Sequence, residues 1–587
     1  MFSLRGICMR FSRYRTLAAA FALAVAALPL AGFPKPASCA AIRLPKPAPN
    51  GCRLVVGIVV DQLRADYLER FDDLFGEKGF KRLKAKGAYF ANAHYLHACT
   101  YTAPGHAVVT TGSTAAVTGI IGNKWYDRET GKLVESVTDD ETTGVPEGKG
   151  ASPRRLIVST LGDELKAATG GRAKVIGMSL KNRGAILPAG RAADAAYWFD
   201  DKRGQMQTSS YYMKELPAWV ADFNARRIPD QWFGKAWEKA LPESAYARCD
   251  ADDAPYEGRF AGGGSAFPHV VGRGDKPNSR FYDEFARTPW ANDFLADFAA
   301  AAIAGEGLGA DAIPDVLTIS FSANDLAGHA FGPNSHEALD MTVRTDQTLA
   351  RLLDLVDQKV GLEKTLIFLT SDHGVSPVPE YAQRQRLNSR RIPFEQVAVA
   401  IKRALDAKFG EGAWFAGFSA ESVYFDLETL AAKRLDRADV ERAAAEAALS
   451  VGGIAAAFTR TQMLSGALPR TPIAQRVQMA FHPQRGGDVF LVPEPFCFFS
   501  DEVSTMATTH GTPYPYDTHV PVLLMGRGVA AGTYLTQASP ADIAPTLAVL
   551  LGIAAPSGAV GRPLDEALLD RPAAPTRSRE RQPANSK

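Results

Sequence analysis

The sequence lacks the features that mark several specialised classes of protein. Its 66 Lys and Arg residues nearly balance 64 Asp and Glu residues, and a net charge of +2 over 587 residues gives no global bias towards nucleic acid or an anionic membrane. No internal repeat is evident, and none of the six cysteines has the C-x-x-C spacing of a metal-binding pair. What remains is an ordinary globular composition, 46% hydrophobic, on a chain long enough for a large core.

The N-terminus has an apolar run, but it is too short to span a membrane. Residues 17–28 are all apolar, follow four arginines, and are followed by the small residues Ser38-Cys39-Ala40. This order is typical of a secretory signal with its cleavage site. We therefore predict a signal peptide over residues 1–40, a periplasmic or secreted protein, and no transmembrane segment in the mature chain. A lipid anchor at Cys39 is the minor alternative.

Few cysteines would remain after removal of that segment: Cys52, Cys99, Cys249 and Cys497. In an exported chain four cysteines permit two disulfides with three possible pairings. Free buried thiols are the other interpretation, and the sequence does not choose between them.

Short apolar runs alternate with helical stretches along the chain. The strand-like runs cover residues 54–60, 173–180, 316–321, 365–369 and 520–525. Runs that are apolar throughout fit strands buried on both faces of a parallel sheet. Residues 66–86 look helical, and leucines and valines at helical spacing in 341–360 predict a helix that covers one face of the sheet. The expected fold class is therefore α/β.

Two stretches interrupt this alternation. Residues near 200–300 are rich in Trp, Tyr, Pro and Gly, and residues near 378–505 include strand-like segments and a helix predicted at 437–449. We interpret both as insertions that cap one end of the sheet, within one folded domain of residues 41–570. Residues 571–587 are rich in Pro and Arg without apolar periodicity, so we predict a disordered tail.

Six side chains of the kinds that bind metals lie in four short stretches, each beside an apolar run. They are Asp61, Asp325, His329, Asp372, His373 and His510. Ligands gather at the carboxyl ends of the strands in an open parallel sheet, and three carboxylates with three imidazoles suit two zinc ions. Any one of these residues alone would more often be a helix cap or a structural histidine. Four coincident motifs favour the metal interpretation.

A fifth stretch, CTYTAPGHAVVTTG, supplies a hydroxyl group. Thr102 precedes Ala103-Pro104, and proline suits the first turn of a helix, so Thr102 should lie at or before the N-cap. The free N–H groups there attract phosphate. An ordinary capping threonine is the plainer interpretation, but the metal motifs favour a nucleophile, because bound Zn²⁺ lowers the pKa of a hydroxyl. Two metals and a hydroxyl indicate phosphoryl transfer.

Several motifs together resemble the alkaline phosphatase superfamily. They span roughly residues 50–560 and read VVDQLRADYLERF, YTAPGHAVVTTG, GIIGNKWYD, SLKNRGAILPAG, NDLAGHAFGPNSHE, TSDHG and THGTPYPYDTHVPVLLMG. They are most similar to its threonine-nucleophile bacterial phosphatases, the PafA-like and PhoK-like enzymes, which are related to nucleotide pyrophosphatase/phosphodiesterases. The resemblance implies a central, mostly parallel sheet with helices on both faces and capping insertions. It also implies a zinc-dependent phosphate monoester hydrolase that works through a phosphothreonine.

The resemblance also assigns roles to individual residues. It implies that one zinc is held by Asp325, His329 and His510, and the other by Asp61, Thr102, Asp372 and His373. Asn123 would donate to a phosphoryl oxygen, and Lys181 and Arg183 match the cationic pair of the monoesterase branch. A monoester carries two negative charges on the transferred group and a diester one, so this pair favours monoesters. His106 and His519 are assigned to neither metal.

The main alternative is a phosphodiesterase or nucleotide pyrophosphatase that uses the same two-metal threonine site. A sulfatase is less consistent with the sequence, because no Cys/Ser-x-Pro-x-Arg motif corresponds to Thr102-Ala103-Pro104. We expect small-molecule phosphate monoesters as substrates, no nucleic acid partner, and a monomer.

Overall fold

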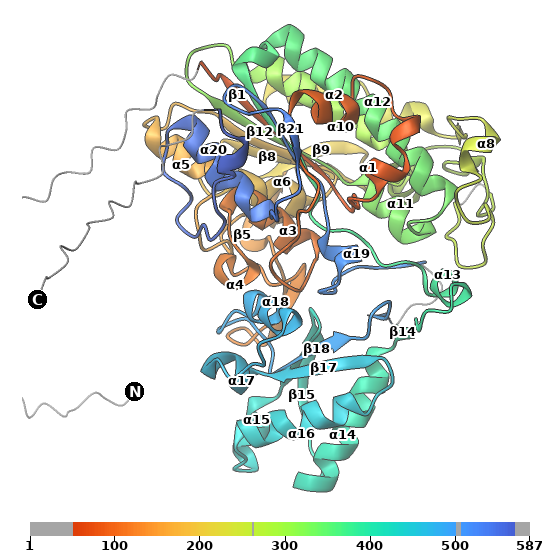
Figure 1. Ribbon diagram of the computed structural model, residues 1–587, viewed down its shortest axis with the longest axis vertical. Coiled ribbons are helices and arrows are strands. Elements are labelled where there is room, and N and C mark those ends of the chain that lie inside the picture. Colours follow the sequence, from red (N-terminus) through yellow and green to blue (C-terminus); the bar gives the residue numbers. More distant parts are fainter. Residues whose placement is uncertain (1–50, 261–262, 501–505, 570–587) are drawn as a thin grey trace, which may run out of the picture. The chain divides into compact units, whose positions relative to one another are not determined.

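The computed structural model describes residues 51–260, 263–500 and 506–569. The predicted signal peptide and the predicted tail both lie outside these residues. Within them the strands form one sheet of 11 strands, one of four strands and three of two strands. Figure 1 shows the large sheet surrounded by helices, with the four-stranded sheet and its own helices forming a separate layer.

The large sheet is mixed but parallel at its centre. Its strand order is β21-β2-β20-β13-β1-β12-β7-β8-β9-β5-β6. The bounds of these strands in chain order are β1 Leu54–Val60, β2 Ala88–Phe90, β5 Thr138–Val145, β6 Lys149–Ala151, β7 Val175–Ser179, β8 Ala195–Asp200, β9 Gln205–Ser209, β12 Asp315–Phe321, β13 Thr365–Thr370, β20 Val522–Gly526 and β21 Gly532–Tyr534. The five neighbours β13, β1, β12, β7 and β8 are all parallel. The predicted α/β class with a mostly parallel sheet is confirmed, although β20 runs antiparallel to β13.

The central strand β1 shows why its own run contains no polar residue. Leu54, Val56 and Ile58 belong to the hydrophobic cluster on one face of the sheet, whereas Val55 and Val59 belong to the cluster on the other face. Alternate side chains of a strand point to opposite faces, and here both faces are covered by helices. Every position in the strand is therefore buried.

Helices cover both faces of the large sheet, as the sequence predicts. One face is covered by α1 Tyr67–Arg70, α2 Phe80–Lys86, α7 Ala218–Ala225, α9 Ser279–Ala286, α10 Pro289–Glu306, α11 Ala323–Phe331 and α12 His336–Lys359. The other face is covered by α3 Thr102–Thr111, α5 Leu161–Ala168 and α20 Ile543–Leu551, next to α4 Ala115–Thr118 and α6 Asn182–Ala189. The groups around α10 and α12 and around α5 and α20 lie on opposite sides of the sheet in Figure 1.

The helix predicted over residues 66–86 is broken into three pieces. Helix α1 is followed by a 3₁₀ turn at Asp72–Leu74, and α2 begins only at Phe80. The cause is Asp346 of α12, whose carboxylate accepts the backbone N–H groups of Gly76 at 2.9 Å and Phe80 at 2.7 Å. A long-range contact of this kind overrides local helical propensity.

The four-stranded sheet has a hydrophobic core of its own. It consists of β15 Phe415–Ser419, β16 Ser422–Phe425, β18 Val489–Pro493 and β17 Ile454–Thr459, in that order. Around it lie α14 Phe394–Phe409, α15 Leu427–Ala432, α16 Arg437–Leu449, α17 Arg460–Ser465 and α18 Pro472–Ala480. We refer to residues 391–499, which contain all of these elements, as the cap segment. Helix α16 spans the predicted residues, whereas aromatic residues between 200 and 300 join the core of the large sheet.

The remaining elements are short. Three two-stranded ribbons pair β3 Lys124–Asp127 with β4 Lys132–Glu135, β10 Ala236–Trp237 with β11 His269–Val270, and β14 Arg391–Ile392 with β19 Phe498–Phe499. Short helices occur at α8 Glu243–Tyr246, α13 Pro379–Arg384 and α19 Pro515–Thr518. Among the described residues no helix is both long and apolar enough to cross a membrane. All four described cysteines are free thiols. The sequence allowed either disulfides or free thiols, and this structure has free thiols.

The approach of α6 to β7 depends on a glycine. Gly177→Ala should lower the free energy of unfolding by about 1–3 kcal/mol. The added Cβ would lie 2.1 Å from the carbonyl oxygen of Ala185 in α6 and 2.9 Å from the Cβ of Ala189. Urea denaturation measures the loss. Gly263→Ala is the control, because a Cβ there meets no atom within 4 Å; equal losses in both variants would contradict the steric explanation.

Candidate active site

The predicted metal ligands come from neighbouring elements of the large sheet. Strands β13, β1 and β12 are adjacent and parallel, so their carboxyl ends meet at one edge. Asp61 directly follows β1, and Asp372 and His373 lie just beyond β13. The helix after β12 carries Asp325 and His329. The sheet order thus brings together motifs that are more than 300 residues apart in the sequence.

Asp325 and His329 point to the same place because they are four residues apart on one helix. Both lie on α11, where residues i and i+4 share a face. Asp325 Oδ1 lies 3.2 Å from His329 Nε2 and 3.5 Å from His510 Nε2. His510 comes from the loop that precedes α19, so this triad joins two parts of the chain as predicted.

Asp372 and His373 belong to the same cluster although they are adjacent in the sequence. His373 Nε2 lies 3.4 Å from Asp372 Oδ2 and 3.5 Å from Asp61 Oδ1. The His373 ring also stacks on His510, with ring centroids 3.4 Å apart. The turn at Gly374 is close-packed, since a Cβ there would lie 2.2 Å from the carbonyl oxygen of Tyr516. All six predicted side chains are therefore joined in one continuous cluster of contacts.

Each of the three histidines is oriented by the backbone. Their Nδ1 atoms lie 2.7–2.9 Å from the carbonyl oxygens of Thr508, Gly374 and Thr100. A carbonyl can only accept, so each ring donates from Nδ1 and its Nε2 is a free acceptor when the ring is neutral. Burial also lowers the pKa of His373 to about 3. A neutral ring with its proton on Nδ1 is the tautomer in which a histidine binds a metal through Nε2.

Burial of three acids at one place leaves too much negative charge. Asp61, Asp325 and Asp372 are at most 2% exposed. Lys181 Nζ lies 2.7 Å from Asp61 Oδ2 and also bonds Asp325 Oδ2. Even so, burial and then the charges of Asp325 and Asp372 raise the pKa of Asp61 well above its usual value. Lys181 therefore leaves Asp61 short of positive charge, whereas the neighbouring His329 and His373 hold the pKa of Asp325 and Asp372 below the usual value despite burial.

The unsatisfied atoms of the cluster fit a metal. Asp61 Oδ1, Asp372 Oδ2 and His373 Nε2 are buried and have no hydrogen-bond partner. Buried polar atoms are normally paired, and carboxylate oxygens with imidazole nitrogens are the ligands that zinc prefers. There are two sets of three residues, and within each set the donor atoms all lie within 4.8 Å of one another. The first set is Asp325, His329 and His510, and the second is Asp61, Asp325 and His373.

The first set is the predicted one, whereas the second differs from the expectation. It includes Asp325 where the expectation has Asp372. The oxygens of Asp372 have other neighbours: Oδ1 accepts the backbone N–H of Gln62 at 3.1 Å, and Oδ2 lies 3.1 Å from Nδ1 of His106. Asp325 is therefore the residue that the two donor sets share.

Two residues in this network were not predicted. The Gln62 amide donates to Asp325 Oδ1 at 2.6 Å, and Gln62 has a positive φ of 67° that non-glycine residues seldom adopt. His106 also lies 2.7 Å from the Ser320 hydroxyl. The position of Gln62 directly after Asp61 and the four-residue spacing from Thr102 to His106 were signals that could have identified both.

Thr102 lies where a hydroxyl can meet an anion at the end of a helix. It is the first residue of α3, follows the N-cap Tyr101, and is 1% exposed. Asn123 is next to it, because its Oδ1 accepts the backbone N–H of Ala103 at 2.9 Å. That bond fixes the Asn123 side chain beside the helix start. Gly105 allows α3 to approach the backbone of Asp372 closely, since a Cβ at position 105 would lie 2.2 Å from the carbonyl oxygen of Asp372.

Arg183 contrasts with Lys181 in its partners. It lies in the first turn of α6, two residues from Lys181, and its charge opposes the raised pKa of that lysine. Within the described residues its guanidinium has no ion pair, and its Nε is buried without a hydrogen-bond partner. A half-buried cation with no acid partner is suited to an anionic ligand.

The cap segment contacts Tyr101, the residue before Thr102. Glu421 is 5% exposed and accepts a short hydrogen bond from the Tyr101 hydroxyl. Burial, partly offset by this bond, raises the Glu421 pKa to about 8. Ala420 and Glu421 both have positive φ, so the tight turn between β15 and β16 presents Glu421 to Tyr101. No motif in the sequence pointed to this contact.

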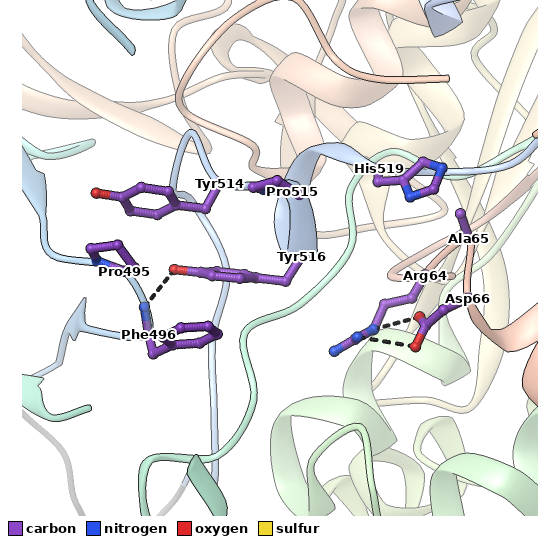
Figure 2. A pocket seen from close by; sticks show the side chains of 9 residues that line it. All are labelled: Arg64, Ala65, Asp66, Pro495, Phe496, Tyr514, Pro515, Tyr516 and His519. Carbon is purple, nitrogen blue, oxygen red and sulfur yellow. Dashed lines mark hydrogen bonds and ion pairs between the residues drawn. The ribbon is translucent and has the colours of Figure 1, made fainter. Parts of the chain in front are cut away.

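A cavity of about 380 Å³ is lined in part by the segment from Tyr514 to His519. This segment is hydrogen-bonded to the Asp372–Gly374 loop. Figure 2 shows Tyr516 between Phe496 and Tyr514, opposite the paired side chains of Arg64 and Asp66. None of the predicted ligands lines it. His519 lines this cavity and bonds the Ala91 carbonyl, in agreement with its exclusion from the metal ligands.

Comparison with known proteins assigns this arrangement to a family. Residues 55–512 match the model of the type I phosphodiesterase / nucleotide pyrophosphatase family. The chain belongs to this family. Alkaline phosphatase PhoV of Synechococcus elongatus is 36% identical over 523 residues, which are 88% of this chain and 93% of that protein. A protein of Myroides odoratus named calcium-transporting ATPase is 37% identical over 522 residues, with 88% and 94% covered.

The fold is also that of a solved relative. Alkaline phosphatase PafA of Elizabethkingia meningoseptica is 36% identical over 521 residues, which are 88% of this chain and 94% of that protein. The crystal structure of wild-type PafA superimposes with a TM-score of 0.83 and covers 89% of this chain and 99% of its own. A solved variant of PafA has one Thr, one Asn, one Lys and one Arg replaced, at the spacings of Thr102 from Asn123 and of Lys181 from Arg183. The resemblance to the PafA-like alkaline phosphatases is confirmed.

The metal interpretation predicts a coupled loss. His329→Ala should remove about one metal ion per chain and lower activity with it, because three protein ligands and one open position make a catalytic zinc site. Elemental analysis and turnover are measured on the same sample. His94→Ala is the control, since His94 stacks on His519 and belongs to neither donor set. Unchanged metal content in His329→Ala would exclude His329 as a ligand.

Proposed function

We propose that this member of the family is a zinc-dependent alkaline phosphatase that hydrolyses phosphate monoesters through a phosphothreonine at Thr102. The observation that carries the proposal is the cluster of buried Asp and His side chains with free Nε2 and carboxylate atoms, beside a helix that begins at Thr102. The relatives named alkaline phosphatase support the reaction, and their high coverage extends the likeness over the whole fold.

The ligand assignment follows from the donor sets. Asp325, His329 and His510 would hold one zinc ion. Asp61 and His373 would hold a second, with Thr102 and Asp372 completing its ligands as the resemblance implies. Bound zinc supplies Lewis acidity, which lowers the pKa of a coordinated hydroxyl and stabilises charge on a leaving oxygen.

The protein groups have distinct tasks in the reaction. The Thr102 oxygen forms a bond to phosphorus as the bond to the ester oxygen breaks, and the leaving oxygen takes up a proton. Water then attacks phosphorus, inorganic phosphate leaves, and Thr102 regains its proton. The side-chain amide of Asn123, whose Oδ1 is fixed by the backbone N–H of Ala103, donates to a phosphoryl oxygen.

Lys181 and Arg183 provide the preference for monoesters in this proposal. Lys181 balances the charge of Asp61 and Asp325, so it lies at the metal ligands and can share its N–H groups with a phosphoryl oxygen. Arg183, without an acid partner, is free to bind two oxygens in a fork. The doubly charged group of a monoester gains more from two cations than the singly charged group of a diester.

A diesterase is the second candidate, because the family is described by phosphodiesterase and nucleotide pyrophosphatase activity. It would use the same threonine and metals.

Export and a monomeric state are proposals drawn from the sequence. N-terminal sequencing of the exported protein, with cleavage expected near residue 40, tests export. The mass of the protein in solution tests the monomeric state. The proposed domain of residues 41–570 likewise rests on the sequence.

The nucleophile can be tested by trapping. Thr102→Ala should abolish the covalent phosphoenzyme and lower turnover by several powers of ten, whereas Thr102→Ser should keep a working hydroxyl. Mass spectrometry of acid-quenched enzyme locates the phosphate. The control is Thr110→Ala, also on α3 but eight residues further along. Phosphate found on another residue would overturn the assignment, but residual hydrolysis by the alanine variant would not, since bound metal can still activate water.

Substrate charge distinguishes the two candidate functions. Arg183→Ala should lower kcat/KM for an aryl phosphate monoester by roughly one to two powers of ten, the effect of losing charge-assisted hydrogen bonds of about 1.5–3 kcal/mol. The loss for the matching diester should be far smaller. The double variant with Lys181→Ala should widen the difference, if zinc content is measured and retained.

The exposed Arg172, which bonds only the carbonyl of Thr169, provides an Arg→Ala control. Equal losses on monoester and diester in Arg183→Ala, with zinc intact, would show that Arg183 is structural. That result would favour the diesterase.

A further inference from the structure

A second cavity, of about 460 Å³, begins at the proposed phosphate-binding residues. One side is formed by Tyr101, which precedes the nucleophile, and by Asn123 with its neighbour Lys124. The opposite side belongs to the cap segment and includes the rings of Phe394 and Phe418. An ester whose phosphorus lies at Asn123 therefore has this space available for the rest of the molecule.

The walls of this cavity differ in chemistry. Asn123 and Lys124 are polar, and Lys124 is exposed. Phe394 and Phe418 are only half-buried, so the cavity exposes aromatic surface that folding alone would tend to cover. Their rings are 6.3 Å apart and inclined by 51°, and Phe394 is held by stacking on Phe499 at 4.7 Å. An aromatic group can pack on such surfaces by stacking or edge-to-face contact.

The cap side of the cavity is fastened to the side that carries Asn123. The Ser419 hydroxyl donates to the carbonyl of Lys124 at 2.7 Å. A Cβ on Gly122 would lie 2.8 Å from the Cβ of Ala420, so the two backbones are in close contact. These contacts keep Phe418, which directly precedes Ser419, at a fixed place relative to Asn123. The aromatic surface is thus part of a built site.

We propose that this cavity binds an aromatic leaving group of the phosphate monoester, and that Phe394 and Phe418 determine specificity for it. The inference rests on the proposed function, since it assumes that phosphorus is bound between Thr102 and Asn123. The aromatic group has two possible sources: a ring joined directly to the ester oxygen, as in an aryl phosphate, or a base carried by a sugar, as in a nucleotide.

Matched substrates separate the aromatic contact from the chemical step. AMP and ribose 5-phosphate have the same kind of primary alkoxide leaving group and differ in the base, and phenyl phosphate carries its ring on the ester oxygen. With the zinc-loaded full-length enzyme, Phe418→Ala should lower kcat/KM for AMP or phenyl phosphate roughly tenfold, the effect of losing one aromatic stacking contact. Ribose 5-phosphate should be hydrolysed nearly as before.

Two further variants guard against a folding defect. Phe418→Leu keeps apolar volume without a flat face and should show the same selective loss. Phe409→Ala is the control, because Phe409 ends the helix that Phe394 begins and lies outside the cavity. Adenosine or phenol, whichever corresponds to the affected ester, should also inhibit Phe418→Ala less strongly than the unmodified enzyme.

The outcomes are distinct. A loss confined to phenyl phosphate assigns the cavity to rings on the ester oxygen, and a loss confined to AMP assigns it to a nucleobase; either supports the proposal. Equal changes on ribose 5-phosphate and both aromatic esters, or no change on any, overturn it while leaving the phosphatase intact. Failure of the unmodified enzyme to hydrolyse any of the three monoesters would instead overturn the proposed function.

Discussion

The constraint on which the site depends is the burial of three carboxylates at one edge of a parallel sheet. Isolated from water, Asp61, Asp325 and Asp372 repel one another and lose their hydration, so they need positive charge close by. Lys181 provides one charge, and the raised pKa of Asp61 shows that it is insufficient. Further positive charge beside Asp61 would stabilise its ionised form. The metals that we propose and the burial that the fold imposes are therefore connected.

Asp325 is the residue that connects the parts of this cluster. Its Oδ1 receives the amide of Gln62 and faces His329 and His510, while its Oδ2 bonds Lys181. It belongs to both donor sets and so joins them through one side chain. The positive φ of Gln62 fits this picture, since strained backbone persists where the surrounding structure over-determines it.

The sequence was sufficient for those features that local pattern controls. Apolar runs predicted the central strands, and the spacing of Asp325 and His329 predicted a shared helical face, because both depend on neighbours in the chain. The predicted 66–86 helix failed because Asp346, far away in α12, takes up the amides of Gly76 and Phe80. The antiparallel direction of β20 was likewise invisible, since an apolar run carries no information about strand direction. Glu421 could not be found because its contact with Tyr101 exists only after the cap segment has folded against the sheet.

The same cap segment explains how one family fold can acquire its own specificity. The sheet edge fixes the proposed metal ligands, and α3 fixes Thr102, the proposed nucleophile, so the positions of these groups have little freedom to vary. The turn at Ala420 and Glu421 reaches that edge from an element with a separate core, and it approaches both Tyr101 and Gly122. Side chains on the strand before this turn can change without disturbing the carboxylate cluster, because they pack in a different core. Selection among leaving groups can therefore evolve in the cap while the chemistry of phosphoryl transfer stays in the sheet.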